Sequence, residues 1–183
     1  MKSTFKLFIL LFAFSSFAGA QGLPNNFRQL LNKAKMQFTM PPGFKATPVL
    51  DNGDVVYDFA VKSNTSGLEI RYRIWPIDMT VTNPNALFEP MLITMGLNIS
   101  GGKMVQPQRY PDESVKEEFG ADAGCTSAVP VNSDFGKGYT KCMFSAIHKD
   151  NVADAYIFYL FDNQDEIMSA LTTERVFHAL KFK

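Results

Sequence analysis

The sequence has little of what recognisable active sites are usually built from. Its 183 residues include two cysteines, two histidines and one tryptophan. It contains no G-x-S-x-G, H-E-x-x-H, P-loop or G-x-G-x-x-G pattern, so the common hydrolase, metalloprotease and nucleotide-binding signatures are missing. With two histidines, a histidine-based triad has few candidates. We therefore expect no cofactor and no catalytic residue of a recognised type, although this does not exclude an enzyme without such signatures.

Long hydrophobic runs are also missing, apart from one short run at the N-terminus. Two lysines precede an apolar stretch over residues 7–14, and small residues at 18–20 suit a cleavage site. This order is typical of a secretory signal peptide, whereas a run this short does not span a bilayer comfortably. We predict that residues 1–20 are a signal peptide cut after Ala20, that residues 21–183 form a single domain, and that the protein is periplasmic or secreted.

An excess of charge of one sign is missing as well. Removing the two signal-peptide lysines from 18 basic residues leaves 16, against 18 acidic residues, and the basic residues form no block. Such a chain has no cluster of basic residues that would bind nucleic acid or an anionic membrane. We expect a protein or small-molecule partner in the cell envelope, no nucleic acid, and no membrane span after signal removal.

The apolar pattern predicts an α+β domain, in which an antiparallel sheet has helices on both faces. The runs "DVVYDFAVKS" and "GLEIRYRIWPID" are joined by turn residues, which predicts a hairpin. The run "VADAYIFYLF" is apolar on both faces from Ala155, which is typical of a strand in the middle of a covered sheet. Helices are predicted near 24–34, 87–101, 111–120 and from 163 onward, and further strands from 36 to the Pro-Pro-Gly corner at 41–43, and near 103–106, 125–131 and 138–148.

Cys125 and Cys142 flank a predicted hairpin. If they lie directly opposite each other, Val129 pairs with Gly138 and "NSDF" is left as a four-residue loop. In an oxidising compartment such a pair is expected to join. The alternatives are buried free thiols, a redox pair or a metal site, but the spacing is not C-x-x-C and zinc needs three or four ligands. We predict a Cys125–Cys142 disulfide and no metal.

The candidate binding site lies on the second strand of the first hairpin. Arg71, Arg73 and Trp75 share one face of that strand with Glu69. Two guanidinium groups beside an indole ring can bind a carboxylate or a phosphate. The alternative interpretation is an ordinary solvent-exposed strand face with salt bridges.

Two further clusters suggest other functions. Glu117, Glu118 and Asp122 offer paired carboxylates for a small hydrolase, and the alternative is a solvated helix end. Met91 and Met95 share a helix face, which suits a cavity for an apolar ligand lined by these methionines and by phenylalanines, and the alternative is ordinary core packing.

The order of elements resembles the PsbP-like family. The resemblance is carried by "FTMPPGF", by the hairpin "VVYDFAV…LEIRYRI", by the long hairpin "GYTKCMFSAIHKDNVADAYIFYLF" and by the C-terminal "ALKFK". It covers most of residues 21–183 and implies an antiparallel sheet between helices, with a non-enzymatic accessory or binding role outside the cytoplasm. The N-terminal helix and the cysteine hairpin depart from the family pattern, and no functional residue carries over. We therefore expect an exported binding or accessory domain, with a small hydrolase or a carrier of an apolar ligand as alternatives.

Overall fold

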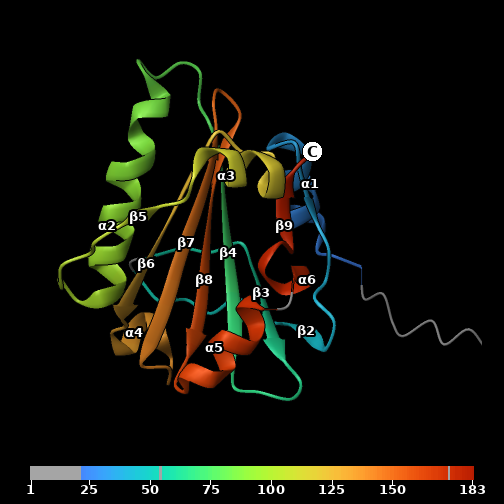
Figure 1. Ribbon diagram of the computed structural model, residues 1–183, viewed down its shortest axis with the longest axis vertical. Coiled ribbons are helices and arrows are strands. Elements are labelled where there is room, and N and C mark those ends of the chain that lie inside the picture. Colours follow the sequence, from blue (N-terminus) through green and yellow to red (C-terminus); the bar gives the residue numbers. More distant parts are fainter. Residues whose placement is uncertain (1–21, 54, 173) are drawn as a thin grey trace, which may run out of the picture.

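The computed structural model describes residues 22–53, 55–172 and 174–183, which fold into an α+β architecture. A seven-stranded antiparallel sheet lies between helices on both of its faces (Figure 1). This confirms the predicted fold class. The predicted signal peptide lies outside the described residues. In the part of the chain that is described, no helix combines the length and the apolar character needed to cross a membrane.

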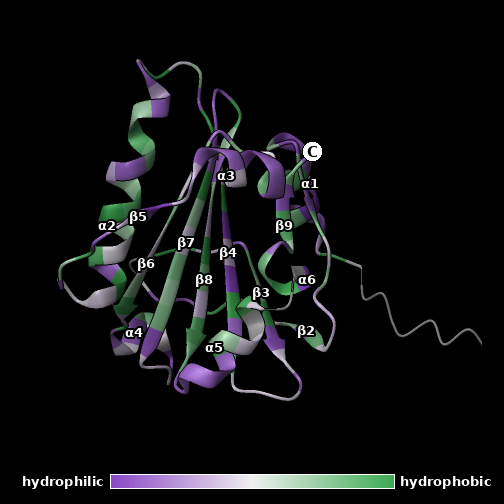
Figure 2. Cartoon of the chain, in the orientation of Figure 1, coloured by the Kyte–Doolittle hydropathy of each residue, from purple (hydrophilic) through white to green (hydrophobic). Residues whose placement is uncertain are grey.

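β8 occupies the middle of the sheet, in the strand order β2-β3-β4-β8-β7-β6-β5. All nine of its residues are buried, as expected for a strand that is apolar on both faces. Figure 2 shows hydrophobic residues along most of its length. The strands of the sheet are β2 (Phe44–Thr47), β3 (Phe59–Ser63), β4 (Glu69–Pro76), β5 (Gln108–Arg109), β6 (Ala123–Pro130), β7 (Lys141–Lys149) and β8 (Ala153–Phe161).

One face of the sheet is covered by four helices and by a two-stranded ribbon. The ribbon pairs a strand from the N-terminal part of the chain with the last strand. In the ribbon, Met36 lies opposite Phe182. The predicted alternation of β4 is confirmed, because Ile70 and Tyr72 belong to the core on this face. The Phe27 ring of α1 stacks on Phe59 of β3, with the ring centroids 4.6 Å apart. The covering elements are α1 (Asn25–Lys33), α3 (Asp112–Phe119), α5 (Gln164–Leu171), α6 (Glu174–Phe177), β1 (Met36–Phe38) and β9 (Leu180–Phe182).

The other face is covered mainly by α2 (Phe88–Ser100), which follows the short 3-10 helix η1 (Pro84–Leu87). α2 starts directly after Leu87, as predicted, and ends at Gly101, whose φ of 68° lies in the left-handed region that favours glycine. Its residues at helical spacing pack onto the sheet, which gives this face a second hydrophobic core. The buried apolar residues of α2 are Phe88, Leu92, Met95 and Ile99.

The hairpin of β6 and β7 departs from the predicted register. Cys142 lies opposite Val129, and Cys125 lies opposite Ala146. The connection is longer than the predicted four-residue loop because part of it folds into a short helix, α4 (Ser133–Gly136). β7 therefore begins at residue 141 rather than near 138, and every pairing that was expected in the hairpin shifts by four residues.

The predicted disulfide is therefore wrong for this structure. Cys125 and Cys142 are both free and buried. Four residues of strand separate them along the hairpin, about 13 Å at 3.3 Å per residue. A disulfide needs Cα atoms within about 7 Å. Burial raises the pKa of the Cys125 thiol to about 12 and also raises that of Cys142, so neither is a reactive thiolate near neutral pH.

The strand predicted at 103–106 is displaced along the chain. The structure places β5 at residues 108–109 instead, directly after Pro107. Proline has no N–H to donate to a sheet ladder, so regular pairing with β6 begins after it. There, Gln108 lies opposite Thr126.

Candidate functional site

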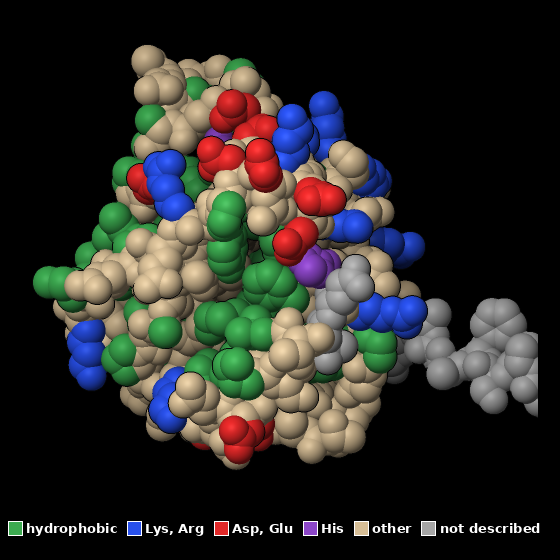
Figure 3. Space-filling model, viewed as in Figure 1, with side chains coloured by type: hydrophobic (Ala, Val, Ile, Leu, Met, Phe, Trp, Pro, Cys, Tyr) green, Lys and Arg blue, Asp and Glu red, His purple; other side chains and the backbone are tan. Residues whose placement is uncertain are grey.

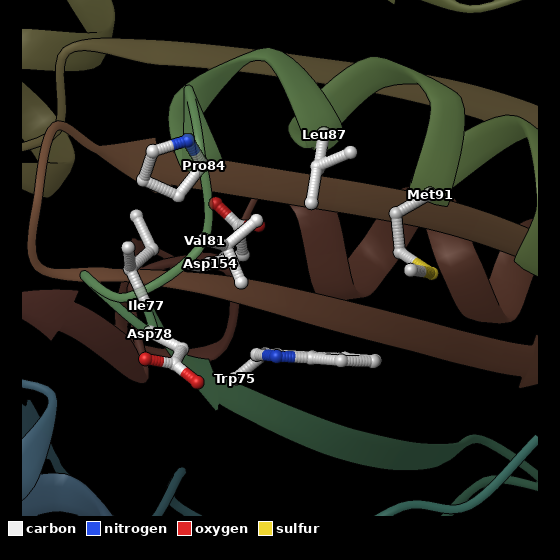
Figure 4. A pocket seen from close by; sticks show the side chains of 8 residues that line it. All are labelled: Trp75, Ile77, Asp78, Val81, Pro84, Leu87, Met91 and Asp154. Carbon is white, nitrogen blue, oxygen red and sulfur yellow. The ribbon is translucent and has the colours of Figure 1, made fainter.

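A pocket opens between one end of the sheet and the start of α2. We call it the Trp75 pocket, and its volume is about 230 Å³. In Figure 4 the Trp75 indole ring is seen edge-on, with Leu87 and Met91 of the helical segment above one side of it. Apart from two carboxylates, the wall is apolar. The lining residues are Trp75, Ile77, Asp78, Val81, Pro84, Leu87, Met91 and Asp154.

Strand pairing brings the polar residues of this region together. Trp75 of β4 lies opposite Asp154 of β8, and Asp154 lies opposite His148 of β7. Residues directly opposite each other in antiparallel strands point to the same face of a sheet. The three side chains therefore form a row across β4, β8 and β7, on the face that α2 covers.

His148 is held between two carboxylates. Its Nδ1 lies 2.6 Å from Oδ1 of Asp154, and its Nε2 lies 2.9 Å from Oδ1 of Asp150. The Tyr156 hydroxyl donates to the other oxygen of Asp154 at 3.3 Å, and the imidazole stacks on Phe88 with the ring centroids 5.0 Å apart. Burial alone lowers the pKa of His148, but the hydrogen bonds and charges of the two carboxylates outweigh burial and raise it.

Asp78 contributes the second carboxylate of the pocket. Its Oδ1 accepts hydrogen bonds from the Thr80 N–H at 2.9 Å and from the Thr80 hydroxyl at 2.7 Å. These bonds lower the pKa of Asp78, which is therefore ionised at neutral pH. Asp78 and Asp154 are the only charged residues among those that line the pocket.

A second pocket adjoins the first. Its volume is about 190 Å³, and it shares Trp75 and Met91 with the Trp75 pocket. The Arg73 guanidinium lies 5.5 Å from the Trp75 ring centroid and binds Asp58 at 3.0 Å. The carrier alternative predicted a cavity lined by methionines and phenylalanines. Met91 lines both pockets and Met95 lines the second, but no phenylalanine lines either.

Arg71 does not reach the surface with the other two residues of the predicted binding site. Its side chain is 0% exposed, and its Nε donates to Oε1 of Glu69 at 2.7 Å. The guanidinium lies 4.9 Å from the ring centroids of both Tyr57 and Phe135, and its Nη1 donates to the Phe135 carbonyl. Only Arg73 and Trp75 of the predicted site are therefore accessible, and Trp75 is 40% exposed.

The carboxylates proposed for a hydrolase do not line any of the pockets described here. Glu117 and Asp122 are exposed. Asp122 accepts the Asp150 N–H at 2.9 Å, and Glu118 lies 2.7 Å from Nε2 of His178. These contacts are those of a polar surface around the ends of α3, so the geometry favours the interpretation as a solvated helix end.

A separate apolar surface is visible in Figure 3, between α3 and α5, over the sheet face opposite α2. On this side of the sheet, Tyr110, Met143 and Phe177 are partly buried and pack against the first core. The Tyr110 hydroxyl pairs with Oγ of Ser145 at 3.0 Å. The Trp75 pocket is the stronger candidate because it combines a cavity, an exposed indole ring and charged groups.

Sequence reasoning missed two of the polar residues of this site. Neither His148 nor Asp154 was assigned to a site, although Asp154 is the only charged residue in the buried strand β8. A carboxylate in an otherwise apolar strand could have indicated this site, because a buried charge needs a partner nearby. Over the described ranges, no group of three or more histidine, cysteine, aspartate or glutamate residues could hold a metal ion.

Comparison with known proteins yields similarity to a solved structure. No family model matches the chain, and no curated protein matches it in sequence. The solution structure of cyanobacterial PsbP (CyanoP) from Synechocystis sp. PCC 6803 is similar, with a TM-score of 0.49 and 12% sequence identity over 82% of this chain and 88% of that one. The expected PsbP-like resemblance is thus found in this comparison, and it assigns no role to any residue here.

Proposed function

We propose that this chain is an exported, non-catalytic binding domain, and that the Trp75 pocket binds a small, mainly apolar molecule. The observation that carries the proposal is an indole ring left 40% exposed in the wall of a pocket. Val81 and Leu87, which line the same pocket, are 43% and 48% exposed. Clustered exposed apolar residues around a concave surface mark interaction sites more often than scattered ones do.

The size of the pocket limits its ligand. A volume of about 230 Å³ lies below the roughly 300–1,000 Å³ typical of sites for drug-sized molecules. We expect a single ring or a short chain rather than an extended polymer. A flexible methionine at the boundary between the two pockets, Met91, allows some adjustment to shape.

The lining supports binding rather than catalysis. It contains no serine, threonine, cysteine, lysine or histidine. Asp154 is already bonded to His148 and Tyr156, and both ring nitrogens of His148 face carboxylates. General base catalysis requires a nitrogen that is directed at the substrate, and neither nitrogen of this imidazole is.

Export is the part of the proposal that rests on the sequence alone. The charged, apolar and small residues of positions 1–20 have the order of a secretory signal peptide. A protein delivered in this way meets small molecules of the cell envelope or its surroundings, which suits a binding domain with a shallow apolar pocket.

The single tryptophan of the chain makes the binding test direct, because all indole fluorescence comes from the pocket wall. We expect 1-hexanol to shift the Trp75 emission to shorter wavelength with a saturable dependence on concentration, as the ring loses contact with water. Leu87→Gln should weaken binding about tenfold, since it removes part of the burial of one leucine side chain.

Leu97→Gln is the matched control, because Leu97 is an exposed leucine of α2 that lines neither pocket described above. It should bind hexanol as the wild type does. A linear, unsaturated response, or equal losses in the two variants, would show that hexanol partitions onto the surface and that the pocket is not a binding site.

A further inference from the structure

We propose that the Trp75 pocket selects organic cations, that is, molecules with a short apolar body and an ammonium group, over neutral or anionic molecules of the same shape. This inference rests on the proposed function, because it names the class of ligand for the same site. It is carried by the charges around the pocket and by their position relative to the indole ring.

The charges that line the pocket have one sign. Asp78 and Asp154 contribute two carboxylates, and no lysine or arginine lies among the lining residues. Low-dielectric walls strengthen the field of such groups and raise the local concentration of the opposite charge. An anionic ligand would be repelled, whereas an ammonium group would gain an attraction that a hydroxyl group does not.

The partner of Asp154 does not cancel this negative field. His148 lies between Asp154 and Asp150, at 2.6 and 2.9 Å. Two ionised carboxylates flank one imidazole, so the three groups together carry a net charge of −1 when His148 is protonated and −2 when it is neutral. The sign of the charge beside the pocket is therefore the same in both protonation states.

The nearby cations are engaged elsewhere or stand outside the pocket. Arg73 is paired with Asp58 at 3.0 Å and lines the adjoining pocket. Lys33 of α1 acts electrostatically on Asp78 but does not line the Trp75 pocket. Neither side chain lines the Trp75 pocket itself, and the charge of the Arg73 guanidinium, 5.5 Å from the Trp75 ring centroid, is balanced by its ion pair with Asp58.

The indole ring adds a second contribution of the same kind. Trp75 lies directly opposite Asp154 in the sheet, and in Figure 4 the Asp154 carboxylate lies on the same side of the ring as Leu87 and Met91. An ammonium group drawn toward Asp154 therefore also approaches the face of the ring. Tryptophan is the side chain that attracts cations most strongly through its π system.

Three ligands with the same six-carbon chain separate charge from shape. Hexylammonium, 1-hexanol and hexanoate do not absorb where tryptophan does, so each can be titrated against Trp75 emission at pH 7 and physiological salt. We expect hexylammonium to bind at least about fivefold more tightly than hexanol, and hexanoate to bind most weakly.

Asp78→Asn tests the origin of that preference without disturbing a buried group. It should reduce the ratio of hexylammonium affinity to hexanol affinity severalfold. Asp51→Asn is the matched control, since Asp51 is also exposed and also accepts the N–H two residues ahead, at 3.1 Å, but lies outside the pocket. Its affinity ratio should match that of the wild type.

The outcomes distinguish this inference from the proposed function. If hexanol and hexylammonium bind equally, if hexanoate binds most tightly, or if Asp78→Asn leaves the ratio unchanged, the cation preference is refuted while the binding site stands. If none of the three compounds gives saturable binding, by emission or by ligand-observed NMR, both proposals are refuted.

Discussion

Glu69→Leu is expected to destabilise the protein strongly, because it leaves a buried guanidinium without a counter-charge. The Arg71 side chain is 0% exposed, and its partner Glu69 is 9% exposed at a distance of 2.7 Å. Around the guanidinium are two aromatic rings and one backbone carbonyl, and its Nη2 has no hydrogen-bond partner among the described residues. Removing one member of a buried ion pair costs about 3–5 kcal/mol, and we expect a loss in that range.

The reverse change should cost less. Arg71→Met leaves Glu69 directly opposite Lys62 of β3, which already interacts electrostatically with Glu69 and can supply a new counter-charge. The loss then consists mainly of the contacts of the guanidinium with Tyr57 and Phe135, about 2 kcal/mol together. The double replacement Glu69→Leu with Arg71→Met removes both charges, and such apolar replacements are often neutral within about 1 kcal/mol.

Urea unfolding followed by circular dichroism at pH 7 measures all three values, and equal m-values would show that the variants expose the same surface on unfolding. Glu117→Leu serves as the exposed control and should stay within about 0.5 kcal/mol of the wild type. The reasoning is refuted if the double variant loses the sum of the two single losses, because independent sites add and coupled ones do not.

This pair also bears on how binding experiments are interpreted. Because Arg71 is buried, replacing it changes stability before it changes any surface. A loss of ligand binding in an Arg71 variant would therefore report unfolding or repacking around Phe135 and Tyr57, which contact the guanidinium. Arg73 and Trp75, which are accessible, are the residues of that strand whose replacement tests binding directly.

Three further predictions concern other parts of the chain. The pKa of His148 is raised in the folded state, so its protonation stabilises the fold, and this contribution is complete below about pH 6.5. As the pH rises from there through the raised pKa, the free energy of unfolding of the wild type should fall relative to that of His148→Gln. Urea unfolding of both proteins across this pH range measures the difference. Cys125 and Cys142 should react with a thiol reagent in denaturant without reductant and resist it in the native protein; an intact mass two hydrogens below the dithiol form would contradict the observed register. Protein purified from an export host should begin at Gln21, which N-terminal sequencing or intact mass tests; retention of residues 1–20 would contradict cleavage.

The parts of the fold that were predicted correctly have strong local signals. β8 carries apolar residues on both faces, and this alone indicates a central strand. α2 has apolar residues at helical spacing and a glycine pair at its end, where Gly101 adopts the left-handed conformation. In such segments the spacing of the apolar residues and the residues that end the element indicate the same structure, so a single sequence is enough to assign the helix or strand.

The register of β6 and β7 was wrong because it depends on the conformation of the loop. Asn132 caps α4 by accepting the Phe135 N–H at 2.8 Å, and Lys137 and Gly138 follow with positive φ values of 49° and 110°. Asn132 is a residue type that commonly caps helices, so the start of α4 could have been predicted from the sequence. The positive φ of Lys137 could not have been predicted, because it results from the packing of the loop. Side-chain alternation alone permits any shift by an even number of residues.

The site was harder to predict than the fold because its residues meet only through long-range pairing. Trp75 was singled out for its strand face, which the structure confirms, but its neighbour Asp154 belongs to a strand much later in the chain. Nothing in the spacing of the two residues indicates that β4 lies beside β8. The segment before η1, which contributes Val81 to the pocket, has no regular pattern, and no helix or strand was predicted there.

Asp154 connects the stability of the sheet with the proposed selectivity, and Asp154→Asn separates the two roles. The amide keeps an acceptor for Tyr156 and a hydrogen bond to His148, so the change removes a charge and little shape. We expect the loss of a charge-assisted hydrogen bond to cost about 1–2 kcal/mol in urea unfolding. If Asp154 serves the sheet alone, the ratio of hexylammonium to hexanol affinity should not change. If it also attracts the ligand, that ratio should fall severalfold while hexanol binding persists. A ratio equal to that of the wild type would restrict Asp154 to its structural role and leave Asp78 as the source of any cation preference.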